Sequence, residues 1–150
     1  MIKVKYVHTN LIAEDWKSLS EFYINVFGCV LVPPERNYSG EGIEKGTSIK
    51  NVSVRGVHLR LPGWDNGPTL EIFSYSPSAE RKDKPINRSG FGHIAFEVEN
   101  VLDAQQKVLN SGGKKIGEIV TLSTSDDRKV TWCYVADPED NVIELQSWSY

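Results

Sequence analysis

The chain has 150 residues, of which 39% are hydrophobic and 25% are charged, and its formal net charge is -3 at pH 7. This length suits a single domain, or two small modules that share a core. Lys and Arg are spread along the chain, which disfavours nucleic acid and anionic lipid as partners. No run approaches the roughly 18 apolar residues of a membrane span, and the N-terminal sequence lacks an apolar signal region. We therefore expect a cytoplasmic protein.

The two cysteines, Cys29 and Cys133, are far apart in the sequence and form no CxxC pair. Two such residues are too few for a disulfide scaffold and have the wrong spacing for a zinc knuckle. Free cysteines are frequently buried, so we expect two free thiols in the interior, within strands.

The first half of the chain follows the order strand, helix and three strands. Asp15 is placed as an N-cap before an apolar helical repeat, and Gly28 is placed to end that helix. The sequence predicts strands at 3–12, 29–34, 52–62 and 69–75, a helix at 16–27, and a long polar loop at 35–51.

The second half repeats this order after a charged, proline-containing linker at about 77–89. Asn100 is the expected N-cap of the second helix, and Gly112 or Gly113 is the expected end. Strands are predicted at 90–99, 114–122, 129–137 and 141–149. The sequence thus predicts one α+β domain over 1–150, built from two paired β-α-β-β-β modules, the first at about 1–76 and the second at about 90–150.

Each module carries a His in its first strand and a Glu in its last strand. These residues are His8 and Glu71 in the first module, and His93 and Glu144 in the second. A four-stranded module cannot cover a polar-lined sheet face alone, so two modules are expected to pair. Pairing about a pseudo-twofold axis would bring the four side chains together.

Taken one at a time, a strand His is more often a core residue, and a strand Glu more often faces solvent. Glu71 and Glu144, however, lie between apolar neighbours in mid-strand, where an ionised carboxylate needs a partner or a metal. Two imidazoles and two carboxylates suit a divalent first-row cation. We therefore predict one divalent metal per chain, held by His8, Glu71, His93 and Glu144.

Strand alternation also places further side chains on the predicted site faces. The candidates for a substrate pocket are Tyr6, Asn10, Tyr75, Gln146 and Trp148, with core packing as the stronger alternative for the aromatic residues. The face of His58 cannot be fixed because the hairpin register is open, and solvent or helix packing is the favoured place for it. Glu41 and Glu44 lie in the polar loop, where a solvated charge is favoured over a second base.

Four segments carry a resemblance to a known family: VHTNLIAEDWKSLSEFYINVFG, GPTLEIF, GFGHIAFEVENV and YVADPEDNVIELQSW. The chain resembles the glyoxalase/bleomycin resistance/dioxygenase superfamily, also called vicinal oxygen chelate proteins, over nearly its whole length. The resemblance implies paired modules that form a cupped mixed sheet around the metal, often across a homodimer interface. It also implies that the ligands of glyoxalase I and methylmalonyl-CoA epimerase match His8, Glu71, His93 and Glu144.

The resemblance implies a metal-dependent lyase or isomerase that stabilises an enolate of a small α-oxo, thiol-adduct or acyl-CoA substrate. Glu144 and Glu71 are then the candidate catalytic residues, and Glu144 is preferred by family analogy. For a lyase or isomerase of this kind we expect the metal to be Zn, Ni, Co or Mn rather than Fe. The alternatives are an extradiol-type dioxygenase, which uses two His and one Glu around iron, and a non-catalytic binding or resistance protein. Glutathione is doubtful as the thiol, because Ile12 and Tyr75 replace the expected arginine and asparagine. Epimerase relatives commonly carry glutamine at the position of Glu71.

Overall fold

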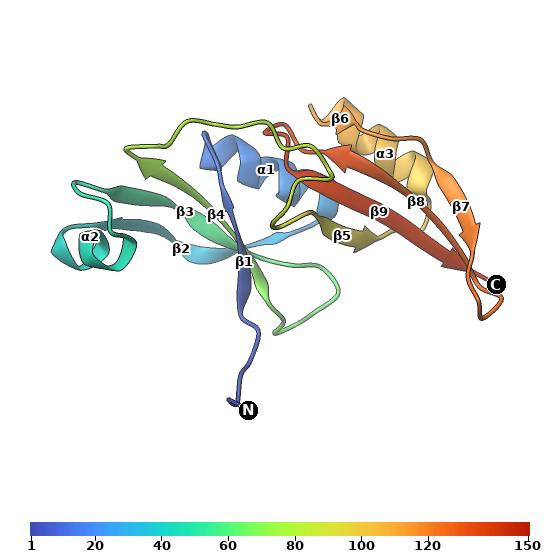
Figure 1. Ribbon diagram of the computed structural model, residues 1–150, viewed down its shortest axis with the longest axis horizontal. Coiled ribbons are helices and arrows are strands. Elements are labelled where there is room, and N and C mark those ends of the chain that lie inside the picture. The colour runs from blue at the N-terminus through green and yellow to red at the C-terminus, as the bar shows by residue number, and fades with distance from the viewer. The chain divides into compact units, whose positions relative to one another are not determined.

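The computed structural model describes all 150 residues, and the chain divides into two compact units, residues 1–81 and 82–150. Each unit consists of a β-sheet with a long helix packed on one of its faces (Figure 1). The predicted α+β class and the two sheet-and-helix modules are therefore confirmed. No helix in either unit has the length and apolar character needed to cross a membrane.

Unit 1 is a four-stranded sheet in the order β1-β4-β3-β2, in which β1 is parallel to β4 and the other neighbours are antiparallel. Its elements are β1 (His8–Ile12), α1 (Trp16–Phe27), β2 (Val30–Ser39), α2 (Glu41–Thr47), β3 (Ser53–Arg60) and β4 (Thr69–Ser76).

Helix α1 has the ends that the sequence predicts. The Asp15 carboxylate accepts the backbone N–H groups of Lys17 and Ser18, and Gly28 ends the helix in the left-handed conformation at φ 69°. The Ser74 hydroxyl oxygen accepts the N–H of Trp16 at 3.2 Å, so α1 begins over the sheet face that carries Ser74. We call this side the helix face.

The two faces of the unit 1 sheet differ in character. Leu70 and Ile72 of β4 lie on the helix face and are buried, together with their β3 partners Leu59 and Val57. Each such side chain contributes about 1.5–3 kcal/mol when it is fully buried. Alternation along β4 then places Glu71 on the opposite face, which we call the site face.

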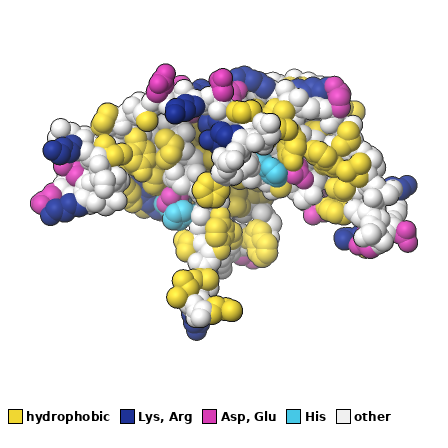
Figure 2. All heavy atoms as spheres, in the orientation of Figure 1, with side chains coloured by type: hydrophobic (Ala, Val, Ile, Leu, Met, Phe, Trp, Pro, Cys, Tyr) yellow, Lys and Arg dark blue, Asp and Glu magenta, His cyan; other side chains and the backbone are white.

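Strand β1 is shorter than the predicted strand at 3–12. The Thr69 N–H donates to the Val7 carbonyl, but β4 begins there, and Pro68 before it has no N–H to offer. Residues 1–7 therefore have no partner strand, and they extend away from β1 (Figure 1). The apolar side chains of Ile2 and Val4 on this tail are exposed, and Figure 2 shows hydrophobic side chains along the tail.

The predicted strand at 29–34 and loop at 35–51 are also corrected. Strand β2 continues past Pro33 and Pro34 to Ser39, because two extra residues form a bulge between Val32 and Arg36. Part of the expected loop, residues 41–47, is helix α2. This helix is held by Ile43, which packs on a buried cluster that includes Phe73.

Unit 2 is a second sheet in the order β5-β9-β8-β6, with β7 paired to β8. Its elements are β5 (Ile94–Glu97), α3 (Val101–Asn110), β6 (Lys114–Lys115), β7 (Val120–Ser123), β8 (Lys129–Ala136) and β9 (Val142–Ser149). Helix α3 starts as predicted, with the Asn100 side chain accepting the N–H groups of Leu102 and Asp103.

The helix face of unit 2 is apolar, and its site face carries Glu144. Cys133, Val135, Ile143 and Leu145 are all fully buried on the helix face of β8 and β9. Alternation places Glu144 and its β8 partner Tyr134 on the opposite face. The two units therefore repeat the same placement of a carboxylate in a last strand.

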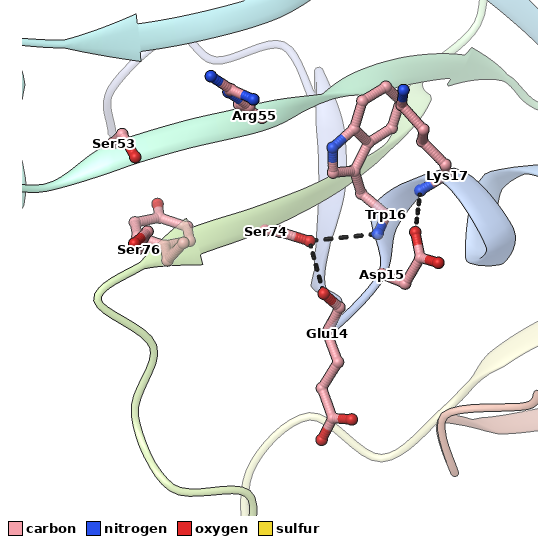
Figure 3. Close-up of a pocket in the computed structure, with 9 residues that line it drawn as sticks. Glu14, Asp15, Trp16, Lys17, Ser53, Arg55, Ser74 and Ser76 are labelled. Carbon is pink, nitrogen blue, oxygen red and sulfur yellow. Dashed lines mark hydrogen bonds between the residues drawn. The ribbon is translucent and has the colours of Figure 1, made fainter.

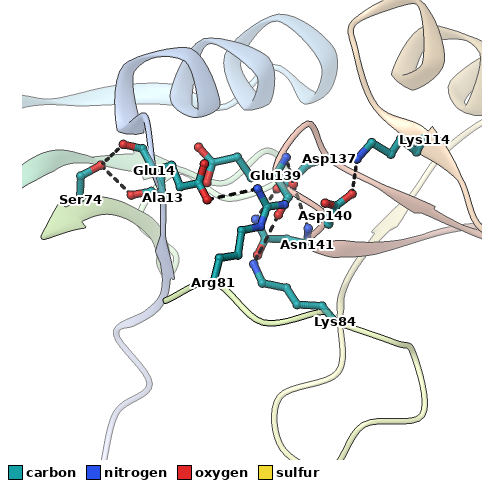
Figure 4. A network of polar contacts seen from close by, with 10 residues as sticks. All are labelled: Ala13, Glu14, Ser74, Arg81, Lys84, Lys114, Asp137, Glu139, Asp140 and Asn141. Atoms are coloured by element: carbon teal, nitrogen blue, oxygen red, sulfur yellow. Dashed lines mark hydrogen bonds and ion pairs between the residues drawn. The ribbon is translucent and has the colours of Figure 1, made fainter. Parts of the chain in front are cut away.

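The turn between β8 and β9 is built by one buried carboxylate. Asp137 accepts the N–H groups of Glu139 and Asn141 at 2.9 Å and the Asn141 side-chain amide at 2.7 Å (Figure 4). The side-chain oxygen of Asn141 accepts a hydrogen bond from Lys84 Nζ at 2.6 Å. The DPEDN sequence thus fixes where β9 starts, and with it the position of Glu144.

Two predicted strands of unit 2 differ from the structure. The strand expected at 90–99 is only Ile94–Glu97, because its partner β9 begins at Val142. The strand expected at 114–122 is divided into β6 and β7. From Lys115 to Val120 the chain advances by five residues, whereas the paired part of β8, from Val135 to Trp132, advances by only three. The strand is therefore interrupted between Lys115 and Val120.

Candidate functional site

The site face of unit 1 gathers three polar side chains around Glu71. The Nε2 atom of His8 lies 3.2 Å from Glu71 Oε2, and the Asn10 amide donates to the same oxygen at 3.2 Å. The Nε2 atom of His58 lies 2.9 Å from the other oxygen, Oε1. These contacts follow from the register, because Asn10 and His58 are the neighbours of Glu71 on β1 and β3. The Glu71 side chain is only 12% exposed.

His58 is held at both ring nitrogens. Its Nδ1 atom lies 3.2 Å from the Thr69 hydroxyl, while Nε2 faces Glu71. Burial lowers the pKa of the His58 imidazole, Glu71 opposes this effect, and electrostatic interactions with Arg36 and His8 add to it. A neutral ring that donates from Nε2 to Glu71 and accepts the Thr69 hydroxyl proton at Nδ1 satisfies all of these contacts.

The site face of unit 2 holds a simpler pair. The Nε2 atom of His93 lies 3.0 Å from Glu144 Oε2, and the Glu144 side chain is 19% exposed. Tyr134 is the β8 partner of Glu144, at the position that His58 occupies in unit 1. Its ring packs against the His93 ring with 5.1 Å between centroids. The Tyr134 hydroxyl makes no hydrogen bond to Glu144 in this structure.

Each pair has the spacing of two ligands on one cation. Ligand atoms that bind a first-row metal at right angles, each about 2.1 Å away, lie about 3 Å from one another. The His8 and Glu71 atoms are 3.2 Å apart, and the His93 and Glu144 atoms are 3.0 Å apart. Neither unit holds three or more His, Cys, Asp or Glu side chains arranged to bind a metal together. Each pair therefore fits half of a ligand set.

The two carboxylates are held to different degrees. Glu71 has neighbours at both oxygens, with His58 at Oε1 and both His8 and Asn10 at Oε2. Glu144 contacts His93 alone among side-chain hydrogen-bond partners. The Glu71 carboxylate is consequently fixed in orientation, whereas one oxygen of Glu144 has no protein partner.

The predicted pocket residues fall in different places. Asn10 contacts Glu71, as described above. Tyr6 belongs to the exposed N-terminal tail, and its hydroxyl contacts the Thr9 hydroxyl. Tyr75 packs against the buried cluster beside α2, which agrees with the alternative of core packing.

The two pocket candidates of unit 2 share the site face with Glu144. Gln146 is half-buried, opposite Trp132 in the register. Trp148 is 39% exposed, and the Arg128 guanidinium lies 4.8 Å from its ring centroid. Trp148 is four residues beyond Glu144, or about 13 Å along the strand, so it is too distant to contact the carboxylate directly.

His58 is the functional candidate that the sequence did not place on the site face. Solvent or helix packing was the favoured prediction, and the structure instead pairs His58 with Glu71. The sequence holds one signal for this position, because the buried Val57 and Leu59 on either side must share the helix face. That signal leaves the strand partner open, since the register depends on the connection at 61–68.

Comparisons with known proteins agree with this architecture. The model of the Glyoxalase/Bleomycin resistance protein/Dioxygenase superfamily matches residues 5–145. A search of curated proteins finds no match. A glyoxalase family protein from Bacillus cereus has a similar structure at a TM-score of 0.74 and 18% identity, covering 100% of this chain and 96% of that one.

A second similar structure is the genomically encoded fosfomycin resistance protein FosX from Listeria monocytogenes. One crystal form gives a TM-score of 0.62 at 16% identity, with 99% and 96% of the two chains covered. Another, complexed with Mn(II) and sulfate, gives 0.54 at 15% identity, with 98% and 93% covered. Identities this low bear on the fold alone, whereas the family model spans most of the sequence. The chain belongs to the glyoxalase/bleomycin resistance protein/dioxygenase superfamily.

Proposed function

We propose that this protein is a metal-dependent lyase or isomerase that moves a proton at a carbon next to a substrate carbonyl. The observation that carries the proposal is the repeated His–Glu pair. Each unit places an imidazole nitrogen 3.0–3.2 Å from a carboxylate oxygen on its site face, in the same register relation to the last strand. One His–Glu pair alone could be an ordinary ion pair, but its repetition in both units supports the binding of one cation by both pairs.

His8, Glu71, His93 and Glu144 would together hold one divalent cation, within one chain or between two copies. Two nitrogen and two oxygen donors suit Zn²⁺, Ni²⁺, Co²⁺ or Mn²⁺. When bound, such a cation supplies a positive charge that stabilises negative charge developing on a substrate oxygen. A homodimer is part of the proposal, because each unit offers only one pair and the resemblance to the superfamily implies that the second pair often comes from another copy of the chain.

We assign different roles to the two glutamates. Glu71 is a fixed ligand, since His58 and Asn10 hold both of its oxygens. Glu144 is the proton carrier, since its carboxylate contacts only His93 and can turn toward a substrate. It would accept a proton from the carbon beside the carbonyl and return it to the same carbon in an epimerisation, or to the neighbouring carbon in an isomerisation.

Solvent-deuterium exchange tests this assignment. The protein is loaded with one of the four cations and incubated in deuterated buffer, without oxygen, with hemithioacetals or acyl-CoA epimers. Deuterium should enter the carbon next to the carbonyl. Glu144→Gln should suppress the exchange more strongly than it weakens substrate binding, because it removes the base but keeps the side-chain shape.

Glu71→Gln is the matched comparison, since the same change is made to the same residue type in the other unit. It should lower metal affinity more than it lowers exchange per bound metal. Equal loss of exchange per bound metal in both variants would contradict the division of roles. A requirement for Fe²⁺ and O₂ with a catechol substrate would refute the isomerase proposal as a whole.

A further inference from the structure

Unit 1 contains a hollow that the proposed metal chemistry does not use. It has a volume of about 480 Å³ and lies at the start of α1, between Trp16 and the ends of β3 and β4 (Figure 3). Ser74 and its β3 partner Arg55 form its floor. Both residues are on the helix face of the sheet, opposite Glu71, so the hollow is separate from the predicted ligands.

The chain pattern explains why a hollow forms here. Along the helix face of β3 and β4, α1 covers Leu59, Val57 and their apolar partners. Past the N-terminus of α1 the same face carries Arg55 and Ser53 on β3, which are paired with Ser74 and Ser76 on β4. The sheet therefore extends beyond the N-terminus of the helix, and the part that the helix leaves uncovered is polar.

Two cations, Lys17 and Arg55, line this hollow, and neither takes part in an ion pair in the structure. Hydrogen bonds from Ser18 lower the pKa of the Asp15 carboxylate, and the charge of Lys17 lowers it further. The Lys17 Nζ atom lies 5.4 Å from the Trp16 ring centroid.

Glu14 and Asp15 also line the hollow, but both carboxylates are engaged, because Asp15 caps α1 and Glu14 pairs with Arg81 at 3.4 Å. In Figure 3 the Glu14 carboxylate points away from Arg55 and the Asp15 carboxylate turns toward the helix N–H groups. The charged donors of the hollow that form no ion pair are therefore the Arg55 guanidinium and the Lys17 ammonium.

The remaining wall offers hydroxyl groups and one flat apolar surface. Ser53 and Ser76 are direct register partners, and their hydroxyls make no hydrogen bond in the structure, so both can donate to a ligand. The indole of Trp16 stands on the other side of the hollow (Figure 3). A smaller hollow of about 240 Å³ adjoins the same Trp16, Lys17 and Arg55, and Glu35, Arg36 and Asn37 of β2 complete its lining.

We propose that this hollow binds a small organic phosphate monoester whose flat apolar part lies against Trp16. A guanidinium fork, an ammonium group and two free hydroxyls offer more donors than the two oxygens of a carboxylate can use, and they match the oxygens of a phosphate. The volume is in the range of about 300–1,000 Å³ that small-molecule sites occupy. The proposal does not depend on the metal or on the reaction assigned to the opposite face.

Phenyl phosphate is the test ligand, titrated into the full chain by calorimetry with and without added divalent cation. We expect the same affinity in both conditions and weaker binding of inorganic phosphate and of benzoate. Arg55→Gln should weaken binding about tenfold or more, because charge-assisted hydrogen bonds are lost. Arg60→Gln is the matched control, since Arg60 is an exposed arginine of the same strand on the opposite face, and it should leave binding unchanged.

Two further measurements keep the result decisive if a variant folds poorly. Arg55→Lys keeps the charge and loses the fork, so it should bind with intermediate affinity, and Trp16→Leu should abolish the preference for phenyl phosphate over inorganic phosphate. Amide chemical shifts should move at residues 15–17, 53–55 and 74–76. Equal weakening by the two glutamine variants, shifts confined to the strands around Glu71, or tighter binding of benzoate would overturn the proposal.

Discussion

Replacing His58 by phenylalanine tests whether this side chain fixes the Glu71 carboxylate. Phenylalanine keeps a flat ring of similar size but removes both hydrogen bonds, the one to Glu71 Oε1 at 2.9 Å and the one to the Thr69 hydroxyl at 3.2 Å. Glu71 Oε1 would then have no partner on a side chain that is only 12% exposed. The carboxylate would regain freedom to rotate away from its ligand position.

The size of the effect follows from these contacts. A hydrogen bond to a charged group contributes about 1.5–3 kcal/mol. Removing a partner that orients a metal ligand typically lowers metal affinity about 10- to 100-fold, and that range corresponds to about 1.4–2.7 kcal/mol. The two estimates agree, so we expect the dissociation constant for Zn²⁺ or Mn²⁺ to rise about 10- to 100-fold in His58→Phe.

Calorimetric titration of the metal-free protein measures this change, with thermal unfolding as a check on the fold. His58→Gln keeps a side-chain N–H donor and should recover most of the affinity. Tyr134→Phe is the matched control in unit 2, where the hydroxyl makes no hydrogen bond to Glu144, and it should change affinity by less than about twofold. An unchanged affinity in His58→Phe, or an equal loss in Tyr134→Phe, would refute the role assigned to His58.

Three other outcomes are expected. Purified protein should carry close to one divalent metal per chain by elemental analysis, and full metal content in the double variant His8→Ala/His93→Ala would contradict the ligand assignment. Light scattering should show a homodimer, and if the ligands come from two chains, mixing the His8→Ala and His93→Ala proteins should restore metal binding that neither has alone. Burial raises the pKa of the Cys29 thiol to about 11, so at pH 8 it should react with iodoacetamide about 100-fold more slowly than free cysteine. Because this pKa is raised in the folded state, the stabilisation is present below the pKa of the unfolded thiol and is lost as pH rises toward 11, which denaturant titrations can follow.

The elements predicted correctly are those whose signals are local. Asp15 and Asn100 are N-caps whose side chains accept the next backbone N–H groups, and Gly28 supplies the left-handed residue that ends α1. These interactions span three or four residues, so a reading of adjacent residues finds them. The burial of Cys133 in β8 follows equally from its apolar neighbours, whereas Cys29 is buried just before β2 rather than within it.

The elements predicted wrongly depend on partners that are distant in the sequence. Strands β1 and β5 are shorter than predicted because β4 and β9, their partners, begin only at Thr69 and Val142. Helix α2 contains Gly42 and Gly46, which give it low helix propensity, and it is stabilised by packing of Ile43 on Val54 and Phe73. No local sequence pattern predicts these contacts.

The site residues that the sequence predicts are also those with a signal visible in the sequence, and His58, which it does not predict, depends on a distant partner. His8, Glu71, His93 and Glu144 could be chosen because the sequence repeats them, and a repeat is visible without knowledge of the register. His58 has no repeated counterpart, since unit 2 has Tyr134 at that position. Its contact with Glu71 depends on the register across residues 61–68, which no turn motif in that segment fixes.

The two units differ at the position that His58 occupies in unit 1 and Tyr134 in unit 2, and this difference decides which glutamate is favoured as the proton carrier. Two identical halves would hold both carboxylates equally, and neither glutamate would be favoured as the proton carrier. His58 and Asn10 fix Glu71, whereas Tyr134 and Ala95, at the equivalent positions, offer Glu144 no side-chain hydrogen bond. Introducing the missing partner with Tyr134→His should therefore slow proton exchange by restraining Glu144 while metal content is kept, and faster exchange in that variant would show that mobility of Glu144 does not limit the reaction.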